Sequence, residues 1–191
     1  MDEIDQLETM LRDRIGNHSK SKMTEVTMMK AALMIIVSLM LGGLCPAWSA
    51  EQDDAALIKA VSGAKVTLQQ GLTASQREGR PISGKFEMEN GKLQLSVYTE
   101  KAGKYFEVIV DHMTGSVTKT EPITEGDDFV DAKAQSVAMA KAKTDLKSAT
   151  NRAAVGSRAV AVTPDLKEGH PIASISFAKG GKLKTATEPL D

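Results

Sequence analysis

A hairpin signal at Asn90-Gly91 constrains the fold of this chain more than any other feature of its sequence. Both residues tolerate the positive φ angles of a type I′ turn, so the flanking segments are expected to pair as antiparallel strands. Folding the chain there places Phe86 opposite Leu95 and gathers the large apolar side chains on one face. Because a slip of one residue would turn that face to water, the register is well specified.

Further turns extend this hairpin into a sheet of consecutive strands. A four-residue connection at 100–103 would place Leu95 opposite Val108, on the same apolar face. A turn at 111–115 then leads into a short fourth strand over 116–121. The sequence therefore predicts an antiparallel β-meander with one face turned to the core.

The opposite face of the meander is predicted to be mostly solvated. It carries the charged and polar residues Lys85, Glu87, Gln94, Ser96 and Glu107. Tyr98, Tyr105 and Ile109 interrupt it, and under the predicted register the two tyrosines are cross-strand partners. These three residues are the candidate partner-binding side chains, because aromatic residues carry much of the energy at interfaces. The alternative, which we favour, is that they receive the second half of the chain.

A short motif ends the third strand and enters the next turn. Its residues are Glu107, Val108, Val110, Asp111, Thr114, Gly115 and Val117. With the preceding helix and the hairpin, this motif resembles the PepSY domain over residues 67–121. PepSY domains occur in propeptides of thermolysin-like peptidases, in the YpeB family and in small exported bacterial proteins. The resemblance implies a non-enzymatic binding module that restrains a peptidase or contacts another envelope protein.

The residues that carry the resemblance are expected to be structural. Asn90 and Gly91 form the hairpin turn, and Gly115 supplies a positive φ. Asp111 is expected to accept backbone hydrogen bonds within its turn, next to Thr114, and not to act as an acid or a base.

Residues 28–50 have the pattern of a cleavable signal peptide. Lys30 precedes an apolar run, and small residues precede Glu51. The run is shorter than the ~20 apolar residues that a spanning helix needs, so no permanent membrane span is expected after cleavage. The preceding polar segment, 1–27, is interpreted as a leader or a mis-called start. The protein is therefore predicted to be exported, to the periplasm or the extracellular space.

The first domain is assigned to residues 51–124. An alanine-rich segment at 53–62 favours a helix. Thr67 and Gln70 have the spacing of a capping box, which predicts a second short helix lying on the meander.

A second, degenerate copy is predicted over residues 131–191. An offset of 78 residues, from Gly91 to Gly169, also aligns Arg80 with Arg158 without a gap. The predicted elements of this copy are one unbroken helix over 131–153, with Val137 and Met139 on its buried side, and strands near 158–165, 170–178 and 182–188.

This copy is truncated, because it ends before any counterpart of the Asp111 turn. Pro164 within its first strand favours an edge position, since proline cannot donate a ladder hydrogen bond. The predicted fold class is thus α+β: a helix packed on an antiparallel β-meander and repeated in tandem. The second copy is expected to dock on the first, since so small a unit would barely fold alone.

No arrangement of residues typical of catalysis, cofactor binding or metal binding appears in the sequence. The histidines, His18, His112 and His170, are scattered, and the glycine-lysine pairs belong to hairpins. The net charge of −1, without a clustered basic segment, gives no reason to expect nucleic-acid binding. We expect neither an enzyme nor a cofactor, but a protein partner. The alternative is a small-ligand or cofactor-binding periplasmic accessory protein, which would need a pocket within or between the copies.

Overall fold

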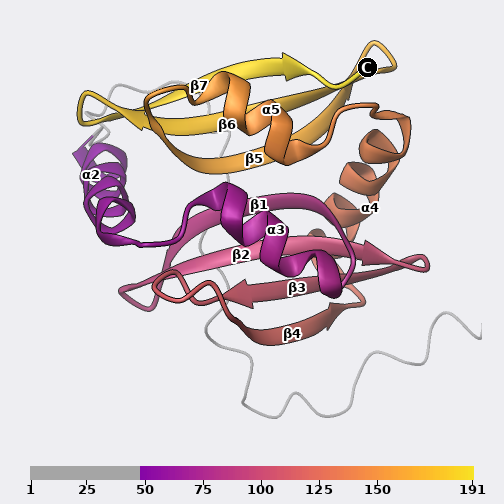
Figure 1. Ribbon diagram of the computed structural model, residues 1–191, viewed down its shortest axis with the longest axis horizontal. Helices are drawn as coiled ribbons and strands as arrows, with labels where there is room; N and C mark the ends of the chain where they lie inside the picture. The colour runs from indigo at the N-terminus through magenta and orange to yellow at the C-terminus, as the bar shows by residue number, and fades with distance from the viewer. Residues whose placement is uncertain (1–47) are drawn as a thin grey trace, which may run out of the picture. The chain divides into compact units, whose positions relative to one another are not determined.

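The computed structural model describes residues 48–191 (Figure 1). The predicted leader at 1–27 lies outside this range. So does the predicted signal peptide at 28–50, apart from its last three residues, which begin the first helix. Within the described range no helix is both long enough and apolar enough to cross a membrane.

Four α-helices and seven strands make up the described residues, and they confirm the α+β class. In chain order they are α2 (Trp48–Gly63), α3 (Leu68–Ala74), the 3-10 turn η1 (Ser75–Arg77), β1 (Arg80–Glu89), β2 (Lys92–Lys101), β3 (Lys104–Val110), β4 (Val117–Ile123), α4 (Gly126–Lys141), α5 (Leu146–Ala153), β5 (Arg158–Lys167), β6 (His170–Lys179) and β7 (Lys182–Pro189). The strands form one antiparallel sheet in the order β4-β3-β2-β1-β5-β6-β7.

The element order recurs along the chain at a fixed interval. Five pairs of elements begin 78 residues apart: α2 and α4 at 48 and 126, α3 and α5 at 68 and 146, β1 and β5 at 80 and 158, β2 and β6 at 92 and 170, and β3 and β7 at 104 and 182. This interval equals the offset found in the sequence. β4 has no counterpart among the described strands.

The helices cover both faces of the sheet. A Cβ on Gly84 would lie 3.2 Å from Leu72 and 3.3 Å from Leu68, so α3 packs directly on that face, which we call the inner face. The adjacent residue, Ser83, points the opposite way and donates a hydrogen bond to Gln135 of α4. α4 therefore lies on the outer face, while α3 and α5 lie next to each other across the inner face (Figure 1).

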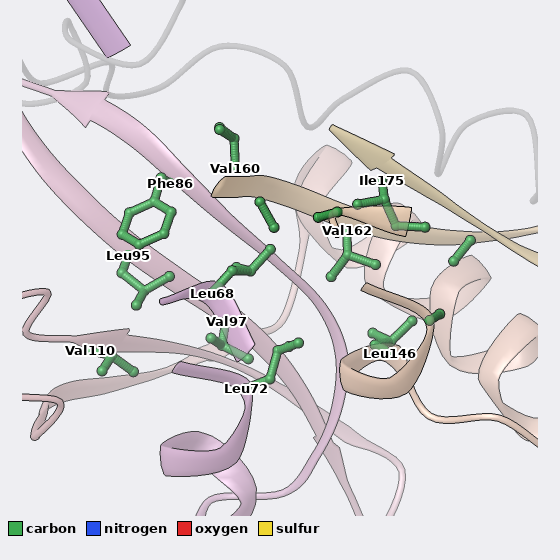
Figure 2. Packing of buried hydrophobic residues seen from close by; sticks show 14 of the residues in the cluster. Leu68, Leu72, Phe86, Leu95, Val97, Val110, Leu146, Val160, Val162 and Ile175 are labelled. Carbon is green, nitrogen blue, oxygen red and sulfur yellow. The ribbon is translucent and has the colours of Figure 1, made fainter. Parts of the chain in front are cut away.

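The hydrophobic core lies under α3 and α5 and runs through both halves of the sheet (Figure 2). Leu68, Phe86 and Leu95 come from the first half and are almost fully buried. Val162 and Ile175 of the second half are equally buried and belong to the same cluster. One continuous core thus joins the two halves.

The two halves of the sheet meet through a very short ladder between β1 and β5. It consists of the pairs Gly84–Val162 and Lys85–Ala161. The predicted edge position of Pro164 is therefore wrong, because β5 lies in the interior of the strand order. Pro164 is tolerated there because it lies two residues beyond the last β1–β5 pair. At that point the described ladder of β5 continues with β6 alone, so the side of β5 that faces β1 needs no hydrogen-bond donor.

The first hairpin is confirmed, with Phe86 opposite Leu95. The predicted register of the second hairpin is wrong by two residues, since Leu95 pairs with Val110. Ala102 and Gly103 form a two-residue turn with φ angles of 53° and 74°, in place of the expected four-residue loop. A shift of two residues leaves every side chain on its predicted face, because side chains alternate along a strand.

The predicted single helix over 131–153 is also wrong. α4 begins earlier, at Gly126, and ends at Lys141, after which the backbone of Ala142 is extended. The amides of Lys143 and Thr144 donate to the carbonyl of Leu190, at 2.6 and 2.9 Å, which turns the chain onto the inner face. Asp145 then caps α5. The capping box of Thr67 and Gln70 at the start of α3 is confirmed.

Candidate functional site

Tyr98, Tyr105 and Ile109 lie half-buried on the outer face of the first half of the sheet. The two tyrosines are not cross-strand partners, because Tyr98 pairs with Glu107 and Tyr105 with Glu100. The correction follows from the two-residue turn at Ala102-Gly103, and it leaves all three candidate residues on the same face.

α4 covers one end of this face. The rings of Tyr105 and Phe129 are 5.6 Å apart and are inclined at 70°, an edge-to-face contact. Further along α4, Gln135 accepts a hydrogen bond of 2.7 Å from Ser83, and Lys141 donates to the carbonyl of Gly169 at the β5–β6 turn. The helix therefore crosses the outer face from β3 to the second half of the sheet. Sequence reasoning missed Phe129, since the predicted helix began two residues after it.

A hydrogen-bonded polar network lies next to Tyr98. The hydroxyl of Ser96 donates to Glu87 at 2.9 Å and accepts from Gln94 at 2.9 Å. The ammonium of Lys85 lies 2.8 Å from the other oxygen of Glu87. The prediction of a mostly solvated face is therefore wrong at its centre: Ser96 is fully buried. The small side chain of Ser96 on β2 is flanked by the longer side chains of Lys85 on β1 and Ile109 on β3.

Burial shifts the titration of this network. It raises the pKa of Tyr98 to about 12, against which the nearby charge of Lys85 acts to lower it. Burial also raises the pKa of Glu107, although the nearby hydroxyl of Ser96 acts to lower it. For Lys85 burial acts to lower the pKa, but the hydrogen bond to Glu87 and the proximity of Tyr98 hold it above its ordinary value. Its Nζ lies 5.7 Å from the centre of the Tyr98 ring, a cation–π distance.

An exposed apolar stripe runs along α4 on this side of the molecule. Val130 is 64% exposed and Val137 is 48% exposed. Ala134, also exposed, lies between them at the spacing that places residues on one side of a helix. The prediction that Val137 belongs to the buried side of the helix is wrong, because Ala132, Ala138 and Met139 form that side. We call Val130, Ala134 and Val137 the α4 stripe.

The motif residues of the turns have structural contacts. One carboxylate oxygen of Asp111 accepts from the amides of Met113 at 2.7 Å and Thr114 at 2.9 Å, and these bonds lower its pKa. Asn90, Gly91 and Gly115 have φ angles of 51°, 75° and 81°, as their turns require.

Within the described range, His112 lies in the turn after β3 and His170 begins β6. The carbonyl of His112 accepts from Lys65 and Val66 and so anchors the α2–α3 connection. Nδ1 of His170 lies 2.9 Å from a carboxylate oxygen of Asp191, a pair that sequence spacing did not indicate. Among the described residues no three His, Cys, Asp or Glu side chains lie close enough together to hold a metal ion.

Neither a family model, nor a curated protein, nor a solved structure matches this chain. The similarity to PepSY domains therefore stays a prediction from the sequence.

Proposed function

We propose that this protein is a non-enzymatic binding module that contacts a protein partner through the α4 stripe and the adjoining outer face of the sheet. The observation that carries the proposal is the exposure of Val130 and Val137 on one side of a helix whose opposite side is buried. Solvent-exposed apolar residues in a row on a helix are typical of helix-mediated recognition. Tyr98 and Ile109, half-buried on the neighbouring strands, extend this surface with an aromatic and an aliphatic side chain.

The PepSY-like motif supports an inference about which class of protein the partner belongs to. Over residues 67–121 it is similar to modules that restrain peptidases or contact other envelope proteins, and residues 28–50 have the pattern of an export signal. We therefore infer an exported protein, periplasmic or extracellular, whose partner is a peptidase or another envelope protein.

Site-specific photocrosslinking in the native host tests the proposal. A benzophenone side chain at position 137 should form an adduct with one envelope protein, identified by mass spectrometry. The matched control is position 155, since Val155 is 75% exposed but lies outside the α4 stripe. Adducts at position 155 of the same kind and yield would contradict the assignment of this surface.

Charge variants then test the surface directly with the purified partner. The double change Val130→Lys and Val137→Lys should weaken binding at least about tenfold, because it places two ammonium groups in an apolar contact. The urea midpoint should stay unchanged, since both side chains are exposed. Val155→Lys is the control, and native-like binding by the double variant would overturn the proposal. If the partner is a peptidase, inhibition of its activity tests the finer assignment.

A further inference from the structure

A hollow of about 250 Å³ lies where the end of α4 meets the start of α5, beside η1 and the start of β1. Part of its lining is apolar and comes from the buried side chains of Leu72, Met139 and Leu146. Three cationic side chains belong to the same lining: Arg80, Lys143 and Lys147. We call this the α4–α5 hollow.

Among the described residues, the lining contains one negatively charged side chain, and its carboxylate is already hydrogen-bonded at the start of α5. This residue is Asp145, which accepts hydrogen bonds from the amide and the hydroxyl of Ser148, at 2.7 and 3.1 Å, as the cap of α5. Three cationic side chains against this one carboxylate leave an excess of positive charge beside an apolar wall, an arrangement that attracts anions.

In the other half of the molecule, the arginine that corresponds to Arg80 is Arg158, and its side chain fills the corresponding place. Arg158 lies 78 residues after Arg80, is half-buried, and donates to the carbonyls of Ala64 at 2.6 Å and Val66 at 2.9 Å. Arg80 donates to the carbonyl of Met139 at 3.1 Å, and its side chain is 42% exposed. Its pair with Glu100 is long, at 3.4 Å. Both guanidinium groups therefore bind backbone carbonyls, but that of Arg80 is the more exposed and its ion pair with Glu100 is long enough for a ligand carboxylate to compete with it.

We propose that the α4–α5 hollow binds a small organic anion, a carboxylate attached to an apolar body. The planar guanidinium of Arg80 matches a carboxylate in a forked geometry, and Lys143 and Lys147 add positive charge around it. The apolar body packs on Leu72 and Met139. A hollow of about 250 Å³ lies just below the roughly 300 Å³ at which pockets for drug-sized ligands begin, so it suits a compact ligand.

This inference goes beyond the proposed protein-binding function. The hollow is lined by neither the α4 stripe nor Tyr98 and Ile109, so the two surfaces can be tested independently. It gives a specific place to the small-ligand function that the sequence leaves open as an alternative.

Titration of the full chain with phenylacetate, followed by amide NMR shifts, tests the site. Saturable shifts are expected at the amides of residues 142–147, with a dissociation constant of about 1 mM or tighter, as suits so small a ligand. Phenylacetamide has the same shape without the negative charge and should bind at least about tenfold more weakly, because it cannot form an ion pair with the guanidinium and ammonium groups.

A charge-matched pair of variants provides the control. The double change Lys143→Gln and Lys147→Gln should weaken phenylacetate binding at least about tenfold. The double change Lys182→Gln and Lys184→Gln removes the same charge from exposed positions on β7 and should leave binding unchanged. Equal losses in both variants, equal binding of the amide, or no saturable shift at 142–147 would each overturn the proposal. All these outcomes are independent of crosslinking at position 137.

Discussion

The pair Phe86 and Leu95 shows how a single residue position determines stability in this sheet. The two residues face each other across the first hairpin, are 2% and 0% exposed, and belong to the core under α3. Truncating either to Ala removes buried methyl or ring groups and leaves a cavity, so each change should cost roughly 2–5 kcal/mol. Urea unfolding monitored by circular dichroism measures this loss.

Glu87, on the opposite face, provides the comparison. Its position on a face with many polar residues suggests a negligible cost for removal, but its carboxylate accepts from Ser96 and pairs with Lys85. Glu87→Ala leaves the buried Ser96 hydroxyl without that acceptor, so we expect a loss of about 1 kcal/mol. A loss equal to that of Phe86→Ala would show that the core lies on the other face.

Tyr98 should titrate abnormally because burial raises its pKa to about 12, from an ordinary value of 10.0. The sequence contains two tyrosines, so Tyr105→Phe leaves Tyr98 as the sole tyrosine. The tyrosinate absorbance of this variant should rise with a midpoint near pH 12. The unfolded chain ionises near pH 10, so Tyr98 costs the fold no stability below that pH and lowers it progressively between about pH 10 and 12. A midpoint near 10 with intact circular dichroism would contradict the burial of this ring.

Residue chemistry predicted some turns and not others. Asn90-Gly91 and the capping box of Thr67 follow rules that depend on neighbouring residues alone, and both are present. The turn at Ala102-Gly103 requires a positive φ at an alanine, which local preference disfavours. That unfavourable conformation could not be predicted from the sequence. The predicted register of β2 on β3 was wrong for this reason alone.

At the scale of whole elements, Arg158 fastens the α2–α3 connection of one half to β5 of the other. Its two hydrogen bonds, of 2.6 and 2.9 Å, come from a half-buried guanidinium. Hydrogen bonds from charged donors are each worth about 1.5–3 kcal/mol, so Arg158→Met should lower the free energy of unfolding by at least about 1.5 kcal/mol. Arg80→Met should cost less, since Arg80 is exposed and makes longer contacts. Urea melts of both variants give the order, and the reverse order would contradict this role.

The helix pattern predicted the presence of helices but not their ends or their arrangement. The segment 131–153 contains no glycine or proline, and the local signal at the break is Asp145, the N-cap of α5, a residue type that also occurs within helices. The break depends on Leu190, whose carbonyl binds the amides of Lys143 and Thr144 from a distant part of the chain.

The candidate site, too, could be predicted from local sequence only in part. Tyr98, Tyr105 and Ile109 were placed on the correct face by alternation, whereas the α4 stripe is defined by which side of α4 the sheet covers.

At the scale of the whole described unit, the two halves share one sheet and one core. The strand ladder that joins them consists of two residue pairs, and so contributes few hydrogen bonds. The two halves are also held together by helix packing. On the inner face α3 and α5 contact each other, and on the outer face α4 crosses both halves. The arginines Arg80 and Arg158 each reach from one half to the backbone of the other.

Neither half should therefore fold on its own. Separating residues 51–124 from 126–191 would expose Leu68 and Val162, which are fully buried in the common core, and would make edge strands of β1 and β5. Each fragment is also small enough that its own core would supply only ~3–5 kcal/mol. We expect each fragment to give a circular dichroism melt without a cooperative transition, and the full chain to unfold in a single transition. Mixing the fragments should restore cooperative melting, since the buried surfaces are complementary. Two separate transitions in the full chain, or a cooperative melt of 51–124 alone, would show that the halves are independent domains.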